Sequence, residues 1–188
     1  MVLSQHTNGI WKIMSPLFLK NNNEVDLISN DGFLTSDECD FLISYHQKQK
    51  KFFYHDSTKY LRMMDIPFYH FKVSSLWKKI VKIIEKDIPY LKLSHGQLVY
   101  WPTLSSQELH IDSDVHPSVS CGDGIVHWSS VCYLNDDYVG GSTLIADTAI
   151  EPLKGRLILF NSKENYHGVD TLSGNRYVLT CWWRDVRK

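Results

Sequence analysis

The sequence lacks the features expected of a membrane protein or of a nucleic-acid-binding protein. None of its apolar runs approaches the roughly 20 consecutive residues that a helix needs to cross a bilayer. Its 20 Lys and Arg residues are balanced by 21 Asp and Glu residues, which gives a formal net charge of −1. Because a phosphate backbone is bound by an excess of basic residues, we expect neither a membrane nor a nucleic acid as a partner.

Cysteines and targeting signals are also scarce. The four cysteines, Cys39, Cys121, Cys132 and Cys181, show none of the paired spacings of zinc fingers. The first residues, MVLSQHTNGIWKIMSP, contain neither a charged leader before an apolar run nor a small-residue cleavage site. We therefore expect reduced thiols and a cytoplasmic protein.

The length and composition are those of one domain. A chain of 188 residues, 43% of them hydrophobic, can bury a single substantial core, so we expect residues 1–188 to form one unit. Ser36, followed by acidic residues, predicts the start of a helix over about residues 37–48. Apolar residues at helical spacing in VSSLWKKIVKIIEKDIPYLK predict a second amphipathic helix that ends near Pro89.

The chain from about Leu93 onward has the pattern of short strands separated by turns. The apolar or alternating runs are GQLVYW, ELHIDSDV, VHWSSVCYL, STLIAD, RLILF and RYVLTCWW. Strands that follow two helices indicate an α+β or mainly β fold, a β-sandwich or jelly roll with the helices packed on one outer face. We expect residues 1–92 to give helical and loop support and residues 93–185 to form the β core.

The stretch ELHIDSDVH places acidic residues and imidazoles on alternate positions. Alternate side chains of a β-strand project to the same side, so His110, Asp112, Asp114 and His116 would share one face. A strand rises about 3.3 Å per residue and can bring about two ligands to one ion, and we favour His110 with Asp112. Non-haem Fe(II) takes two imidazoles and one carboxylate, and we expect His167, after a distant apolar strand, to be the third ligand.

Arg176 opens the last predicted strand, nine residues after His167. A guanidinium offers a bidentate fork that matches a carboxylate, and it stays charged when partly buried. Beside an iron site, Arg176 would therefore suit a dicarboxylate co-substrate, and Thr180 on the same strand face could add a hydroxyl. Without a metal site, Arg176 would be expected to pair with a surface acid such as Asp170.

The order of these motifs resembles that of a known family. His-x-Asp, YLNDDYVGG, PLKGRLILF, HGV and an arginine leading into RYVLTCWW follow one another as in the Fe(II)- and 2-oxoglutarate-dependent dioxygenases of the prolyl hydroxylase branch. The resemblance covers about residues 94–184 and implies a double-stranded β-helix, a jelly-roll core of the cupin type. It also implies iron ligands at His110, Asp112 and His167, and a salt bridge from Arg176 to 2-oxoglutarate.

The resemblance further implies pocket residues and a reaction. Tyr100 and Tyr133 match tyrosines that line the co-substrate pocket of the oxygen-sensing prolyl hydroxylases, and Thr180 and Trp182 match the same subgroup. NDDYVGG and ENYHGV instead resemble the collagen prolyl 3-hydroxylases, so the position hydroxylated on the ring stays open. The implied reaction hydroxylates a prolyl residue of a peptide or protein with Fe(II), O2 and 2-oxoglutarate, releases succinate and CO2, and uses ascorbate as the reductant.

Other functions stay open on the sequence alone. The same chemistry would suit a free amino acid or another small metabolite. A nucleic-acid demethylase of the superfamily typically has a second arginine six residues after the first, where this chain has Trp182. Two histidines and a carboxylate also suit catalytic zinc, although Arg176 has no task in a zinc hydrolase. A non-catalytic jelly-roll binding module is a further alternative, but such a module would not require His110, Asp112, His167 and Arg176 together.

Two pairs of residues have purely structural interpretations as well. We expect Gly140 and Gly141 to occupy a turn that requires positive φ. Tyr100 and Tyr133 equally fit the role of ordinary strand aromatics, because aromatic residues favour strands in general.

Overall fold

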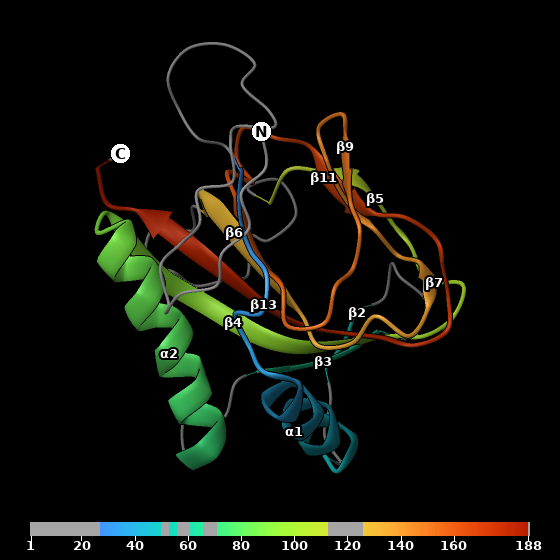
Figure 1. The fold of residues 1–188 in the computed structure, drawn as a ribbon. Helices are drawn as coiled ribbons and strands as arrows, with labels where there is room; N and C mark the ends of the chain where they lie inside the picture. Colours follow the sequence, from blue (N-terminus) through green and yellow to red (C-terminus); the bar gives the residue numbers. More distant parts are fainter. Residues whose placement is uncertain (1–26, 50–52, 56–60, 66–70, 113–125, 188) are drawn as a thin grey trace, which may run out of the picture.

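Two helices and two facing β-sheets make up the part of the protein that the structure describes. The computed structural model describes residues 27–49, 53–55, 61–65, 71–112 and 126–187. Helices α1 (Ser36–Gln47) and α2 (Phe71–Asp87) lie on one side of the larger sheet, and the smaller sheet lies on its other side (Figure 1). Neither helix has the length and apolar character needed to span a membrane.

The larger sheet has seven strands, and neighbouring strands in it pair antiparallel. Its order is β1 (Leu27–Asn30), β10 (Leu157–Phe160), β6 (Trp128–Tyr133), β13 (Arg176–Asp185), β4 (Leu91–Trp101), β3 (Leu61–Asp65) and β2 (Phe53–His55). The long strands β4 and β13 pair along almost their whole length. They form the frame on which the other elements are placed.

The smaller sheet has four antiparallel strands, and a short two-stranded pair accompanies it. Its order is β5 (Gln107–His110), β11 (His167–Val169), β8 (Thr143–Ile145) and β9 (Thr148–Ile150), and the pair is β12 (Leu172–Ser173) with β7 (Val139–Gly140). Two helices followed by facing, mainly antiparallel sheets confirm the expected double-stranded β-helix with helical support.

An outer core lies between the helices and the larger sheet. Leu76, Ile80 and Ile84 recur at helical spacing along α2 and are all buried, as the sequence predicts. Gly96 in β4 leaves room for Trp77 of α2, because an added Cβ would lie only 2.0 Å from the indole. The helix is thereby held close against the middle of the sheet.

An inner core lies between the two sheets. Its members alternate with those of the outer core along β4, β6, β10 and β13, as the two-residue repeat of a strand requires. The buried residues of this core are Val99, Trp101, Val131, Tyr133, Ile145, Ile158, Phe160, Val169, Leu172 and Val178. The inner face of the sheet is therefore the one that faces any site between the sheets.

Two boundaries differ from the predictions. Thr35, not Ser36, caps α1: its hydroxyl accepts from the Glu38 N–H, and the Glu38 carboxylate accepts from the Thr35 N–H. Strand β5 ends at His110, so Asp112 follows the strand in the chain and was wrongly predicted to lie on it. Asp114 and His116 lie outside the described residues.

Candidate metal centre and carboxylate pocket

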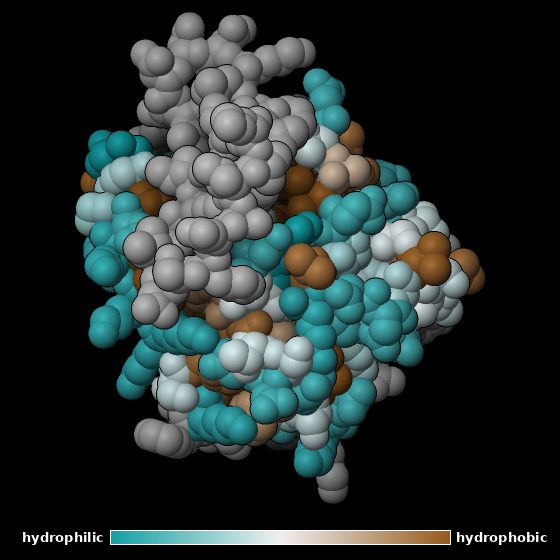
Figure 2. Space-filling view, viewed as in Figure 1, coloured by the Kyte–Doolittle hydropathy of each residue, from teal (hydrophilic) through white to brown (hydrophobic). Residues whose placement is uncertain are grey.

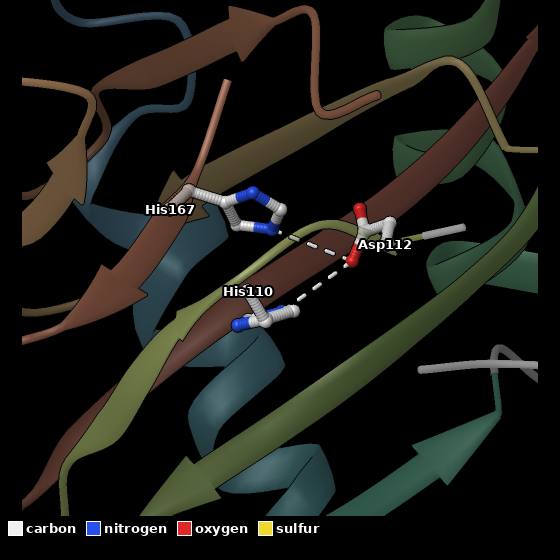
Figure 3. Close-up of side chains that lie close together, drawn as sticks. All are labelled: His110, Asp112 and His167. Carbon is white, nitrogen blue, oxygen red and sulfur yellow. Dashed lines mark ion pairs between the residues drawn. The ribbon is translucent and has the colours of Figure 1, made fainter. Parts of the chain in front are cut away.

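His110, Asp112 and His167 come together between the two sheets. His110 ends β5, Asp112 lies two residues beyond it, and His167 begins β11, where it is the register partner of His110. One ligand atom from each residue lies within 4.8 Å of the others. The Asp112 Oδ1 atom is 3.6 Å from Nε2 of His110 and 3.3 Å from Nε2 of His167 (Figure 3).

The protein backbone orients both imidazoles. Nδ1 of His110 lies 2.9 Å from the Glu108 carbonyl oxygen, and Nδ1 of His167 lies 3.1 Å from the Asn165 carbonyl oxygen. A carbonyl can only accept, so each Nδ1 carries the proton and donates it. Each Nε2 therefore faces Asp112: it donates to the carboxylate when the imidazole is protonated, and in the neutral imidazole its lone pair is free to bind a metal.

A pair of serines orients the Asp112 carboxylate, which is 3% exposed. The Ser129 hydroxyl of β6 donates to Oδ2 of Asp112 and lies 3.0 Å from the buried Ser162 hydroxyl. Oδ2 is thereby occupied, and Oδ1 alone faces the two imidazoles. The arrangement favours a carboxylate that binds through one oxygen.

Charge coupling keeps Asp112 ionised. Burial raises the pKa of Asp112, but the hydrogen bonds from His110 and His167 outweigh burial and hold this pKa well below its usual range. Burial lowers the pKa of His110, and the hydrogen bond to Asp112 outweighs that effect and raises it above the usual value. The site therefore presents a full negative charge beside two imidazoles, and that charge favours a cation.

A second polar group lies around Arg176, at the start of β13. The Arg176 side chain is buried, with 1% of its surface exposed. Its Nη2 donates to the Thr143 hydroxyl at 3.2 Å, and its guanidinium carbon lies 5.1 Å from the Trp101 ring centre and 5.5 Å from that of Tyr133. The Tyr133 hydroxyl also donates to Thr143, at 2.6 Å.

This guanidinium makes no ion pair within the described ranges, and its Nε has no hydrogen-bond partner there. Leaving a buried charge uncompensated costs several kcal/mol. The donors around Arg176 therefore suit an anionic ligand with planar, acceptor-only oxygens, which is the description of a carboxylate. The alternative pairing of Arg176 with Asp170 is absent from the ion pairs of the described residues.

The glycine pair is part of this pocket. Gly140 and Gly141 have φ values of +71° and +67°, which confirms the predicted positive φ, although Gly140 ends strand β7 and does not lie in a turn. A Cβ on Gly141 would also lie 2.9 Å from the Tyr138 ring and 3.4 Å from Cδ of Arg176. Glycine at this position thus lets the backbone approach the arginine side chain closely.

The structure does not bring Tyr100 into the pocket. Its register partner is Tyr177, its ring lies 4.9 Å from the Tyr177 ring on the outer face, and its hydroxyl donates to Asn175. Arg176 is instead paired with Trp101, the next residue along β4. The strand register thus places Trp101, and not Tyr100, beside Arg176.

Thr180 shares the inner face with Arg176, since both belong to β13 and are four residues apart. Its register partners are Gln97 and Val131, and the hydroxyl that contacts Arg176 belongs to Thr143 of β8. Sequence reasoning missed Thr143, Trp101, Tyr138 and Ser129. The places of Thr143, Trp101 and Ser129 follow from strand pairing, which no sequence motif indicates. Tyr138 belongs to the motif YLNDDYVGG and lies just before β7, and the motif did not indicate its position beside Arg176.

The C-terminal part of the chain matches a protein-family model. Residues 96–184 match the model described as the 2OG-Fe(II) oxygenase superfamily. This range includes His110, Asp112, His167 and Arg176. No protein with a curated description matches the chain.

Solved structures share the fold at low sequence identity. A prolyl 4-hydroxylase from Pseudomonas putida is 19% identical with a TM-score of 0.68, and the match covers 85% of this chain and 92% of that one. A viral collagen prolyl hydroxylase from Paramecium bursaria Chlorella virus-1, in complex with 2-oxoglutarate, is 22% identical with a TM-score of 0.67, covering 86% and 97%. A prolyl hydroxylase from Trichoplax adhaerens, in complex with a hypoxia-inducible factor peptide fragment, is 17% identical with a TM-score of 0.66, covering 86% and 85%.

The cluster of His110, Asp112 and His167, the polar group around Arg176 and the family match all indicate the same kind of protein. The cluster offers the two imidazoles and one carboxylate that suit Fe(II). The pocket offers a buried guanidinium for the carboxylate of 2-oxoglutarate. The chain belongs to the 2OG-Fe(II) oxygenase superfamily and is an Fe(II)- and 2-oxoglutarate-dependent oxygenase.

Proposed function

We propose that this oxygenase hydroxylates a C–H bond of a prolyl residue in a peptide or protein, with succinate and CO2 as co-products. The observation that carries the proposal is the combination of a two-histidine, one-aspartate cluster with a buried arginine whose Nε has no partner among the described residues. We assign the catalytic core to residues 93–185 and a supporting role to residues 1–92.

His110, Asp112 and His167 are the proposed metal ligands. Each histidine would bind through Nε2, because its Nδ1 is held by a backbone carbonyl. Asp112 would bind through Oδ1, because Oδ2 is held by Ser129. When bound, iron supplies the redox chemistry that couples the decarboxylation of 2-oxoglutarate to hydroxylation of the substrate. The described residues supply these three ligands, a set typical of non-haem Fe(II) enzymes that also use a co-substrate.

Arg176 is the proposed anchor for the remote carboxylate of 2-oxoglutarate. Its partner Thr143 lies on β8 two residues from Ile145, and Ile145 is the register partner of His167. Two residues of strand correspond to about 7 Å, a separation that a five-carbon keto diacid can bridge. The Tyr133 and Arg176 donors already fill acceptor sites of the Thr143 hydroxyl, so Thr143 keeps its own proton for the ligand.

The inner core has a shielding role in this proposal. Phe160 packs edge-on against the His167 ring, with the ring centres 4.9 Å apart, and Ile145 and Val169 are buried beside it. Excluding water strengthens the charged contacts made in the site and protects reactive species from side reactions. In this proposal the residues of the inner core orient the reactants and shield them from water, and the cofactor carries out the oxidation.

The choice of a prolyl substrate is supported by two kinds of likeness. The motifs YLNDDYVGG and RYVLTCWW resemble those of prolyl hydroxylases, and several solved structures with this fold are prolyl hydroxylases. Ascorbate is the proposed reductant that maintains Fe(II).

The test is a succinate-release screen with Fe(II), 2-oxoglutarate and ascorbate against proline-containing peptides, free amino acids and nucleotides, with mass spectrometry of each product. We expect oxygen to be added to a proline within a peptide. Oxygen added only to free proline or another metabolite would replace the substrate assignment while keeping the enzyme class. Asp112→Ala serves as the inactive control.

A further inference from the structure

Trp101 and Tyr138 are two further hydrogen-bond donors beside Arg176. Trp101 is the register partner of Arg176, and the guanidinium lies over its indole ring. Tyr138 lies near the same arginine, since a Cβ built on Gly141 would lie 2.9 Å from the Tyr138 ring and 3.4 Å from Cδ of Arg176. The Nε1 atom of Trp101 and the hydroxyl of Tyr138 are both buried, and neither has a hydrogen-bond partner among the described residues.

Trp183 provides the contrast within the same sheet. It is as deeply buried as Trp101 but lies on the outer face, where its Nε1 donates to the Ser130 hydroxyl at 3.0 Å. A buried donor without an acceptor is rare in native proteins and costs free energy. The open N–H of Trp101 therefore indicates an acceptor that a ligand brings.

The Tyr138 hydroxyl is a donor under all ordinary conditions. Burial raises the pKa of Tyr138 far above its usual value, and the nearby Arg176 charge offsets only part of that rise. The phenol stays protonated and can give its proton to a ligand oxygen. Trp101 and Tyr138 thus both lie beside Arg176, and all three have a buried polar atom without a partner among the described residues. An ionised carboxylate, which has only acceptors, would suit such a group of donors.

We propose that the Trp101 indole N–H and the Tyr138 hydroxyl donate hydrogen bonds to the remote carboxylate of 2-oxoglutarate, alongside Arg176. This inference rests on the proposed function, because it assigns further binding residues to the same co-substrate. It makes Trp101, and not the neighbouring Tyr100, the aromatic residue of β4 that recognises the ligand. It also gives the carboxylate a polar contact on the side of Tyr138.

The first test is the affinity for 2-oxoglutarate, measured by calorimetry on the Zn(II)-loaded protein so that no turnover occurs. We expect Trp101→Phe and Tyr138→Phe each to weaken binding by about 10-fold, the effect of losing one hydrogen bond to a charged group. The matched controls Trp183→Phe and Tyr177→Phe remove the same groups on the outer face and should keep wild-type affinity. Melting temperatures identify any variant that fails to fold.

The second test needs no folded variant of the site. In the 15N-labelled, Zn(II)-loaded wild-type protein, the indole N–H signal of Trp101 should move downfield when 2-oxoglutarate binds, while that of Trp183 stays in place. Wild-type protein that binds 2-oxoglutarate with a static Trp101 signal, or variants with unchanged affinity, would overturn this inference alone. Failure of the wild-type protein to bind 2-oxoglutarate at all would overturn the proposed function as well.

Discussion

The two faces of the seven-stranded sheet carry the same types of side chain, serine and aromatic residues, but these side chains have different partners on each face. On the outer face Ser130 accepts from Trp183, and Tyr100 packs on Tyr177. On the inner face, the adjacent residues Ser129 and Trp101 face the cluster and the pocket. One residue along the strand thus separates a group that stabilises the fold from a group that serves the site.

The difference between the faces lies in the satisfaction of polar groups. Outer polar groups such as the Trp183 indole find partners within the protein. Inner groups keep open donors, among them Nε of Arg176 and Nε1 of Trp101, which have no hydrogen-bond partner in the described ranges. The donors without partners on the inner face reduce the stability of the ligand-free protein, and a ligand that accepts hydrogen bonds from them would stabilise it. Paired substitutions on the two faces can test this account.

Asp112→Ala should have the largest effect. Removing the only carboxylate of the cluster leaves two imidazoles, so we expect loss of tight Fe(II) binding and a fall in succinate formation to the background without enzyme. The control is Asp147→Ala, at an exposed position of the turn between β8 and β9, which should keep full activity. Iron-dependent turnover in the Asp112 variant, measured by succinate release, would contradict the ligand assignment.

Arg176→Met should separate binding from stability. We expect 2-oxoglutarate affinity to fall about 100-fold, because a charge-assisted, bidentate contact is lost. The free energy of unfolding without ligand should stay the same or rise, because a buried charge is replaced by an apolar side chain. Calorimetry and chemical denaturation give the two values. A stability loss of about 3–5 kcal/mol would instead show that the arginine has a carboxylate partner inside the protein.

Ser129→Ala and Ser130→Ala compare the two faces of the sheet at consecutive residues of β6. Ser129 holds the Asp112 carboxylate, so its loss should weaken metal affinity about 10- to 100-fold, as is usual for groups that orient a ligand. Ser130 accepts from Trp183, so its loss should cost about 1 kcal/mol of stability and leave metal affinity unchanged. Equal metal affinity in both variants would remove Ser129 from the site.

Tyr100→Phe should have the smallest effect. The change removes an exposed hydrogen bond to Asn175, so we expect a stability loss of at most about 1 kcal/mol. The affinity for 2-oxoglutarate should stay within about twofold of wild type, because the ring lies on the outer face. A larger loss of affinity would show that Tyr100 takes part in binding 2-oxoglutarate.

The sequence was sufficient for features that depend on residue type and order. His110, Asp112, His167 and Arg176 could be selected because few structural roles require that set together. The helical period of α2 and the positive φ of the glycine pair were likewise readable, since each follows from local chemistry.

Features that depend on strand register could not be read in this way. A shift of one residue exchanges the faces of a strand, so the choice between Tyr100 and Trp101 depended on a pairing that only the structure gives. Thr143 contacts Arg176 across 33 residues of sequence. Asp112 joins the cluster from beyond the end of β5. Its grouping with His110 was predicted, but the predicted strand at residue 112 was wrong.

Anaerobic titration of the protein with Fe(II) and then 2-oxoglutarate, followed by visible absorption, tests the central claim most directly. The account predicts a weak charge-transfer band in the wild-type protein, because the co-substrate would chelate an iron held by His110, Asp112 and His167. The band should be absent in His167→Ala and should require far more 2-oxoglutarate in Arg176→Met. A wild-type protein that binds Fe(II) but gives no band and no succinate would contradict the account.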